Sequence, residues 1–143
     1  MSEQFPALRA LTEIFHYHIH VYYDETSRAR AVKLHALIGE RFAVQLGRFF
    51  DQPVGPHTMA QYEIGFFADQ FAQLVPWLML NHFDLPILLH PNTDQEREDH
   101  RGSSFWLGQP VPLLLERLDV SLIAAGHAEP RAVTINSTPT VQA

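Results

Sequence analysis

The clearest pattern in the chain is the alternation at residues 16–23, where histidines and a tyrosine alternate with apolar or aromatic residues. A period of two residues is typical of a half-buried strand, because successive side chains point to opposite faces. We therefore expect a strand here. One face would be apolar, and the other would carry His16, His18, His20 and Tyr22.

Three later segments also have the pattern or composition of strands, and they lie at about 41–50, 61–66 and 85–91. A turn rich in proline and glycine at 51–57 separates the first two, which predicts a hairpin. Pro86 cannot donate a backbone hydrogen bond. We therefore expect the last of these strands at an edge of the sheet.

Apolar residues at helical spacing predict two helices. The first spans about 27–40, and the second begins near Asp69, whose side chain would cap it. Pro76 falls inside the second helix, which should kink or restart there. We expect the charged residues 92–101 to form a loop and residues 111–118 a short helix.

The order strand, helix, strand, strand, helix, strand predicts an α+β protein with the ferredoxin-like βαββαβ arrangement and an antiparallel sheet. Right-handed connections put the first strand in the interior and both helices on one face. We expect one domain at residues 1–118 and a partly mobile extension at 119–143. The other face needs cover, so we expect a homodimer.

Composition narrows the possible partners. The chain has 143 residues, no cysteine and a net charge of −6 without a basic cluster, which argues against nucleic acid and anionic membranes as partners. No apolar run approaches the roughly 20 residues of a spanning helix, and we expect a cytoplasmic protein. Without thiolates, any metal ion must be bound by nitrogen and oxygen ligands.

The predicted sheet brings such ligands together. His18 and His20 would lie between Glu63 on one neighbouring strand and His90 on the other. Two or three imidazoles with one carboxylate form the ligand set of non-haem Fe(II) sites that keep open positions, and zinc or manganese would also fit. Open positions would let a catechol bind through both oxygens beside dioxygen, while a nearby histidine acts as base.

Seven motifs occur in a fixed order over about residues 16–110: His18-x-His20-x-Tyr22, Pro53-Val54-Gly55-Pro56-His57, Tyr62-Glu63, Val75-Pro76-Trp77-Leu78, Leu89-His90-Pro91-Asn92-Thr93, Asp99-His100 and Trp106-Leu107-Gly108. Together they resemble the DOPA 4,5-dioxygenase family of the fungal and bacterial type. The resemblance implies an extradiol dioxygenase that uses dioxygen to open the ring of a catechol such as L-DOPA, giving a semialdehyde. It also implies a small ferredoxin-like protein that dimerises.

The motif residues supply the candidate site. As metal ligands we expect members of the set His18, His20, Glu63 and His90, and as catalytic or substrate-contacting residues His57, His100 and Tyr22. Which of them contact the metal stays open at this point. The chain reads His57-Thr58 where the family pattern has His-Pro, and Asn92-Thr93-Asp94 replaces a Thr-Gly after the last motif histidine.

Two other functions fit the same residues. The first is a dimeric protein that binds a metal or an aromatic ligand without turnover. The second is an aromatic oxygenase or isomerase that needs no cofactor. His82 and His127 lie outside every motif and are expected at the surface, and His16 is expected to be exposed at the start of its strand.

Overall fold

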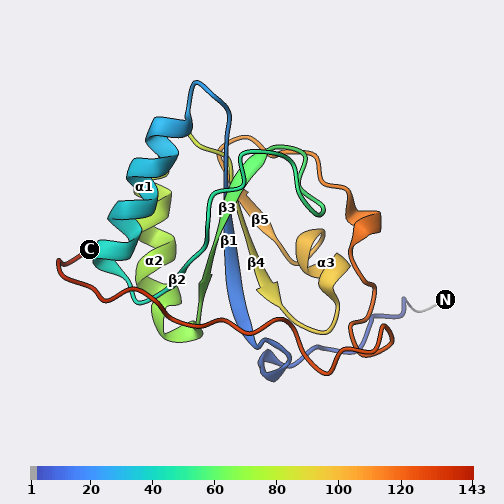
Figure 1. Cartoon of the computed structure of the whole chain (residues 1–143). Coiled ribbons are helices and arrows are strands. Elements are labelled where there is room, and N and C mark those ends of the chain that lie inside the picture. The colour runs from blue at the N-terminus through green and yellow to red at the C-terminus, as the bar shows by residue number, and fades with distance from the viewer. Residues whose placement is uncertain (1–2) are drawn as a thin grey trace.

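The computed structural model describes residues 3–143 and confirms the α+β prediction (Figure 1). The sheet consists of five antiparallel strands in the order β2-β3-β1-β4-β5. The strands and helices are β1 (His16–Tyr23), α1 (Arg28–Arg41), β2 (Gln45–Leu46), β3 (Ala60–Phe66), α2 (Ala68–Leu80), β4 (Ile87–Asn92), α3 (Glu96–His100) and β5 (Phe105–Leu107), with 3-10 turns at Leu11–Glu13 and Leu115–Arg117. Within the described part of the chain, no helix has the length and apolar character needed to cross a membrane.

β1 lies in the interior of the sheet, as predicted, with β3 on one side and β4 on the other. His18 is directly opposite His90 of β4, and His20 is opposite Glu63 of β3. The prediction that the last strand lies at an edge is wrong, because β5 pairs with the outer side of β4. Pro86 precedes β4, and its carbonyl accepts a hydrogen bond from the N–H of Tyr22.

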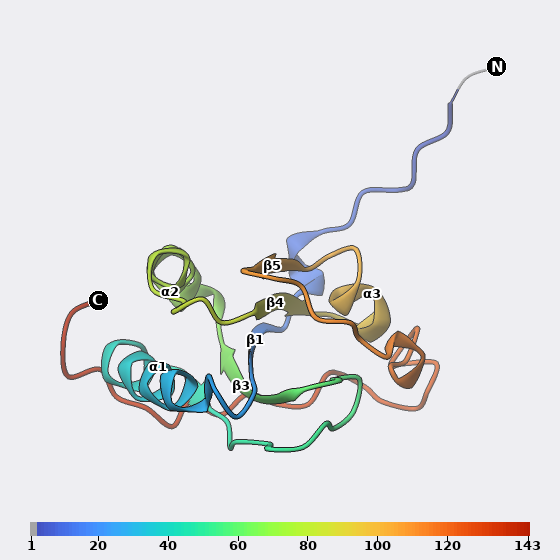
Figure 2. The ribbon, with the colours of Figure 1, turned by 90° about the horizontal axis from the view of Figure 1, so that it is seen from above.

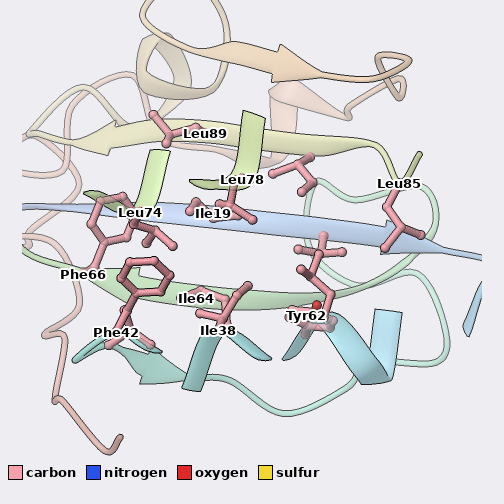
Figure 3. Close-up of a cluster of buried hydrophobic side chains, with 14 of the residues drawn as sticks. Ile19, Ile38, Phe42, Tyr62, Ile64, Phe66, Leu74, Leu78, Leu85 and Leu89 are labelled. Atoms are coloured by element: carbon pink, nitrogen blue, oxygen red, sulfur yellow. The ribbon is translucent and has the colours of Figure 1, made fainter. Parts of the chain in front are cut away.

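Helices α1 and α2 pack on one face of the sheet, while α3 lies on the other (Figure 2). The side chains between the sheet and the two long helices form the main apolar core, which contains Ile19, Ile38, Ile64, Leu74 and Leu78 (Figure 3). Burial of one such side chain stabilises the fold by about 1.5–3 kcal/mol. This packing fixes the alternation of β1, so its histidines must face the side away from α1 and α2.

The predicted strand at 41–50 is too long, because ladder pairing is restricted to Gln45 and Leu46. The preceding residue, Val44, is hydrogen-bonded to the C-terminal segment instead: the N–H groups of Asn136 and Ser137 donate to its carbonyl. The Ser137 hydroxyl oxygen accepts from its N–H. The mobility expected for the extension is not tested by these contacts and stays a prediction.

Three local predictions also need correction. Asp69 does not cap α2, since Phe67 occupies the cap position and the helix continues through Pro76. The expected loop at 92–101 contains α3, because the buried Asp99 carboxylate accepts the N–H and hydroxyl of Thr93 and closes the turn before it. The expected helix at 111–118 is reduced to one 3-10 turn.

Candidate metal centre

Three buried histidines converge on the face of the sheet opposite α1 and α2. One ring nitrogen each from His18, His20 and His90 lies within 4.8 Å of the other two. The rings of His18 and His90 are 5.4 Å apart and those of His20 and His90 are 5.1 Å apart. The prediction that β1 and β4 bring these imidazoles together on one face is therefore confirmed.

The hydrogen bonds of His20 and His90 leave two bare nitrogens facing each other. His90 Nδ1–H donates to the carbonyl of Pro91 at 2.8 Å, and His20 Nδ1–H donates to Gln61 Oε1 at 2.9 Å. Both Nε2 atoms then carry lone pairs, and they lie 3.0 Å apart. Two ligands at a right angle and about 2.1 Å from one ion are also separated by about 3.0 Å. The donor set and its spacing thus fit a shared metal ion.

His18 is held by a carboxylate. Its Nε2 lies 2.7 Å from Glu63 Oε1, and Arg131 donates to both Glu63 oxygens at 2.8 and 3.0 Å. Burial alone would raise the pKa of Glu63, but the His18 hydrogen bond and nearby positive charges hold it well below its usual range. Among the described residues, Glu63 is outside the converging group. Its expected role as a ligand stays a prediction, and here it orients His18.

His57 lies directly beside this group. Its ring is 4.3 Å from that of His20, and its Nδ1 is 2.7 Å from the hydroxyl of Tyr22. The loop that carries His57 has Thr58 where the family pattern has proline, and two contacts hold it in place. Thr58 Oγ1 donates to the Pro112 carbonyl at 2.6 Å, and a β-bridge joins His57 to Leu113.

His100 is carried by α3, next to the other end of the group. Its ring is 3.8 Å from that of His90, and its Nδ1–H donates to the Glu96 carbonyl at 2.8 Å. Burial lowers the pKa of both His57 and His100 to about 4. Both imidazoles are therefore neutral near pH 7, which is the form in which a histidine can act as a base.

A pocket of about 480 Å³ opens beside these histidines. Pockets for small molecules usually measure about 300–1,000 Å³. It is lined by His18, His20, His57 and His100 and by residues of the C-terminal extension, among them His127, Glu129 and Arg131. The pocket is thus large enough for a small aromatic molecule and reaches two of the candidate ligands, His18 and His20.

The contribution of the C-terminal extension to the pocket lining could not be predicted from the sequence. His127, expected at the surface, is exposed but lines the pocket. The expectation that His16 is exposed is wrong: it is buried, and Asn92 Nδ2 donates to its Nδ1 at 2.8 Å. No periodicity after residue 119 signals these contacts, because they depend on side chains such as Arg131 that reach across to β3.

Comparison with known proteins gives a consistent family assignment. The model of the Dopa 4,5-dioxygenase family matches residues 17–117. A crystal structure from Nostoc punctiforme, provisionally named a dioxygenase, is 44% identical, with a TM-score of 0.75, and the match covers 77% of this chain and 96% of that one.

Two curated fungal proteins are also similar. A protein of Amanita muscaria named DOPA 4,5-dioxygenase is 33% identical over 118 residues, which is 76% of this chain and 52% of that protein. An uncharacterised 21.2 kDa protein of Botryotinia fuckeliana is 33% identical over 119 residues, which is 73% of this chain and 61% of that protein. The chain therefore spans between about half and three-fifths of the length of these relatives.

Proposed function

The chain belongs to the Dopa 4,5-dioxygenase family, and from this premise we propose that it is a metal-dependent extradiol dioxygenase acting on a catechol such as L-DOPA. The names of its relatives support a dioxygenase. The observation that carries the finer proposal is the convergence of three buried histidines beside a pocket of about 480 Å³.

His18, His20 and His90 would hold the ion, with Fe(II) as the expected metal and zinc or manganese as alternatives. When bound, Fe(II) would supply open positions at which both catechol oxygens and dioxygen can be brought together. The chain contributes the fixed orientation of the ligands. Gln61 and the Pro91 carbonyl hold the rings of His20 and His90 by their Nδ1–H groups, and Glu63 holds His18.

The remaining residues of the site would handle the substrate. His100 Nδ1–H is bound to a carbonyl, so its Nε2 has a lone pair with which it can accept a catechol hydroxyl proton. His57 is close enough to His20 to contact a substrate held beside it. His127, Glu129, Pro130 and Arg131 also line the pocket, and they would limit access of water to the ring.

Two further expectations belong to this proposal. The first is a homodimer. The sheet face that was expected to need a partner is covered by α3 and the C-terminal extension, so a dimer would instead cover apolar side chains exposed before β1, namely Phe5, Leu8 and Leu11. Sedimentation of the purified chain tests it, and a monomer at all concentrations would contradict it. The second is a cytoplasmic location, which cell fractionation tests.

An anaerobic reconstitution tests the activity. Metal-free protein receives Fe(II) and then air and each member of a panel of catechols, including L-DOPA, dihydroxyphenylacetate, protocatechuate and caffeate. The proposal predicts a yellow semialdehyde whose formation needs both iron and dioxygen. Metal binding without product from any catechol would instead indicate a binding protein, and product that survives chelation would indicate a cofactor-free oxygenase.

A further inference from the structure

We propose that Tyr22 is a positioning residue that fixes His57 in the tautomer with hydrogen on Nε2, so that His57 offers the pocket a hydrogen-bond donor where His100 offers a bare nitrogen. The two histidines would then have opposite roles at one site. What the donor acts on rests on the proposed function, whereas the tautomer itself does not.

The surroundings of Tyr22 set the direction of its hydrogen bond. Its side chain is completely buried in a small apolar cluster with Leu88 and Val111. Among the described residues, the partner of its hydroxyl is His57 Nδ1, at 2.7 Å. If Nδ1–H donated instead, the phenol hydrogen would be left without an acceptor inside apolar surroundings, which is costly. The phenol therefore donates, and His57 Nδ1 is bare.

The second nitrogen of His57 then carries the hydrogen and faces the pocket. Within the described residues, His82 Nδ1 is the one buried side-chain polar atom that lacks a hydrogen-bond partner. His57 Nε2 also lacks such a partner, since the hydrogen bond of this ring is at Nδ1, so Nε2 cannot be a buried atom. His57 lines the pocket. This atom is consequently open to the pocket and free to donate to a bound molecule.

His100 has the opposite arrangement. Its Nδ1 lies 2.8 Å from the backbone carbonyl of Glu96, and a carbonyl can only accept. The hydrogen must therefore be on Nδ1, and Nε2 is bare. His90 follows the same rule, because its Nδ1 is bound to the Pro91 carbonyl. His57 thus differs from His90 and His100 because its Nδ1 partner is a hydroxyl, which can donate.

This difference divides the chemistry between the two residues. His100 can accept a proton from a catechol hydroxyl, while His57 can donate a hydrogen bond to an oxygen of the bound substrate or of dioxygen. His57 would not give its proton away completely. To replace it, Tyr22 would have to pass its own hydrogen to Nδ1 and remain as a phenolate inside the apolar cluster.

Nuclear magnetic resonance of the full chain tests the tautomers directly. The protein is labelled with 15N at histidine and studied at a fixed pH of about 8, both metal-free and loaded with diamagnetic Zn(II). Two-bond couplings between the ring nitrogens and the hydrogens on the ring carbons distinguish a bare Nδ1 from a bare Nε2. We expect the His57 spectrum of an Nε2–H ring and the His100 spectrum of an Nδ1–H ring in the metal-free protein.

Tyr22→Phe removes only the hydroxyl, and Tyr23→Phe is its matched control on the same strand. Tyr23 lies on the opposite face, where its hydroxyl donates to Asp51 Oδ1. In Tyr22→Phe the His57 signals should move towards a mixture of tautomers, and in Tyr23→Phe they should not move. Signals of a bare Nε2 on His57 in the unmodified protein would overturn the proposal, even if Tyr22→Phe does not fold.

Kinetics add a second readout if the chain is an active dioxygenase. Tyr22→Phe should lower kcat by about 10- to 100-fold, as expected for a residue that orients another, with little change in KM. An unchanged kcat, together with an unchanged His57 spectrum, would also overturn the proposal. Absence of activity in the unmodified protein with every catechol would reject the proposed function while the tautomer assignment is decided by the spectra.

Discussion

The two faces of β1 are both buried but hold opposite kinds of residue. Ile19 and Val21 face α1 and α2 and are completely shielded from solvent. His18 and His20 face the other way, and only 8% and 3% of their surfaces are exposed. Apolar burial stabilises the fold, whereas buried imidazoles are costly unless each nitrogen has a partner.

This difference shows that the histidine face is not an ordinary polar surface. A solvent-facing strand side would leave its imidazoles hydrated. Here α3 and the C-terminal extension cover them, and the hydrogen bonds of His20 and His90 leave their Nε2 atoms pointing at each other. One face therefore supplies stability, and the other brings together the candidate metal ligands.

Removing a ligand should affect the histidine face most strongly. We expect His90→Ala and His18→Ala to lower metal affinity by more than about 100-fold, which exceeds the usual effect of losing an outer-shell partner. His82→Ala, outside the group, should leave affinity unchanged. Titration calorimetry and elemental analysis measure this effect. Equal losses in all three variants would mean that the site is misplaced.

Ile19→Ala tests the apolar face with the neighbouring residue of the same strand. Truncating a fully buried isoleucine should lower the free energy of unfolding by about 2–5 kcal/mol, because a cavity remains in the core. Urea unfolding measures the loss. In the folded fraction, metal binding should be largely retained. If Ile19→Ala abolished metal binding as completely as His90→Ala, the two faces would not have separate roles.

Acid should destabilise the protein through the histidine face. Burial lowers the pKa of His57 and His100 to about 4, whereas an unfolded histidine titrates near about 6.5. The unfolded chain therefore binds more protons in this interval, and stability is lost as the pH falls from about 6.5 towards 4. Burial raises the pKa of Asp99 to about 6, and this single group opposes the trend. Burial also lowers the pKa of His20 and His90, so the histidines together outweigh Asp99.

Urea midpoints measured between about pH 7 and pH 4.5 test this prediction. His57→Gln cannot take up the proton, so its stability should change less with pH than that of the unmodified chain. A midpoint that rises steadily as the pH falls, or a profile that His57→Gln leaves as steep as before, would show that the imidazoles are not buried as neutral groups.

The smallest effect is expected at the rim of the site. The Arg131 side chain is 75% exposed where it pairs with Glu63, so Arg131→Ala should reduce stability by less than about 1 kcal/mol. Its effect on the site should be a modest loss of metal affinity, since Glu63 still binds His18. Calorimetry on Arg131→Ala and Arg131→Lys measures it. A loss of metal affinity as large as that of His90→Ala would contradict the prediction that the exposed Arg131 contributes little to the site.

The sequence predicted the parts of the site that depend on local periodicity. The alternation of residues 16–23 placed His18 and His20 on one face, and the order of the elements placed His90 beside them. Contacts between distant residues were not predictable. Asp99 closes the turn before α3 by binding Thr93, and Arg131 reaches Glu63 from 68 residues away.

The same limit explains the errors in the fold. The pattern at 41–50 suggested a full strand, yet Val44 is bound by the C-terminal segment through Ser137. Pro86 suggested an edge, but β5 covers the outer side of β4. In both places a later part of the chain supplies the hydrogen-bond partner, and the local sequence pattern does not indicate which segment that is.

X-ray absorption at the iron edge tests the central claim most directly. The chain is loaded anaerobically with one equivalent of Fe(II), with and without a catechol. The account predicts imidazole scattering from His18, His20 and His90, which weakens in His90→Ala, and a change in the oxygen shell when the catechol is added. Iron without imidazole neighbours, or a spectrum that His90→Ala leaves unchanged, would contradict it.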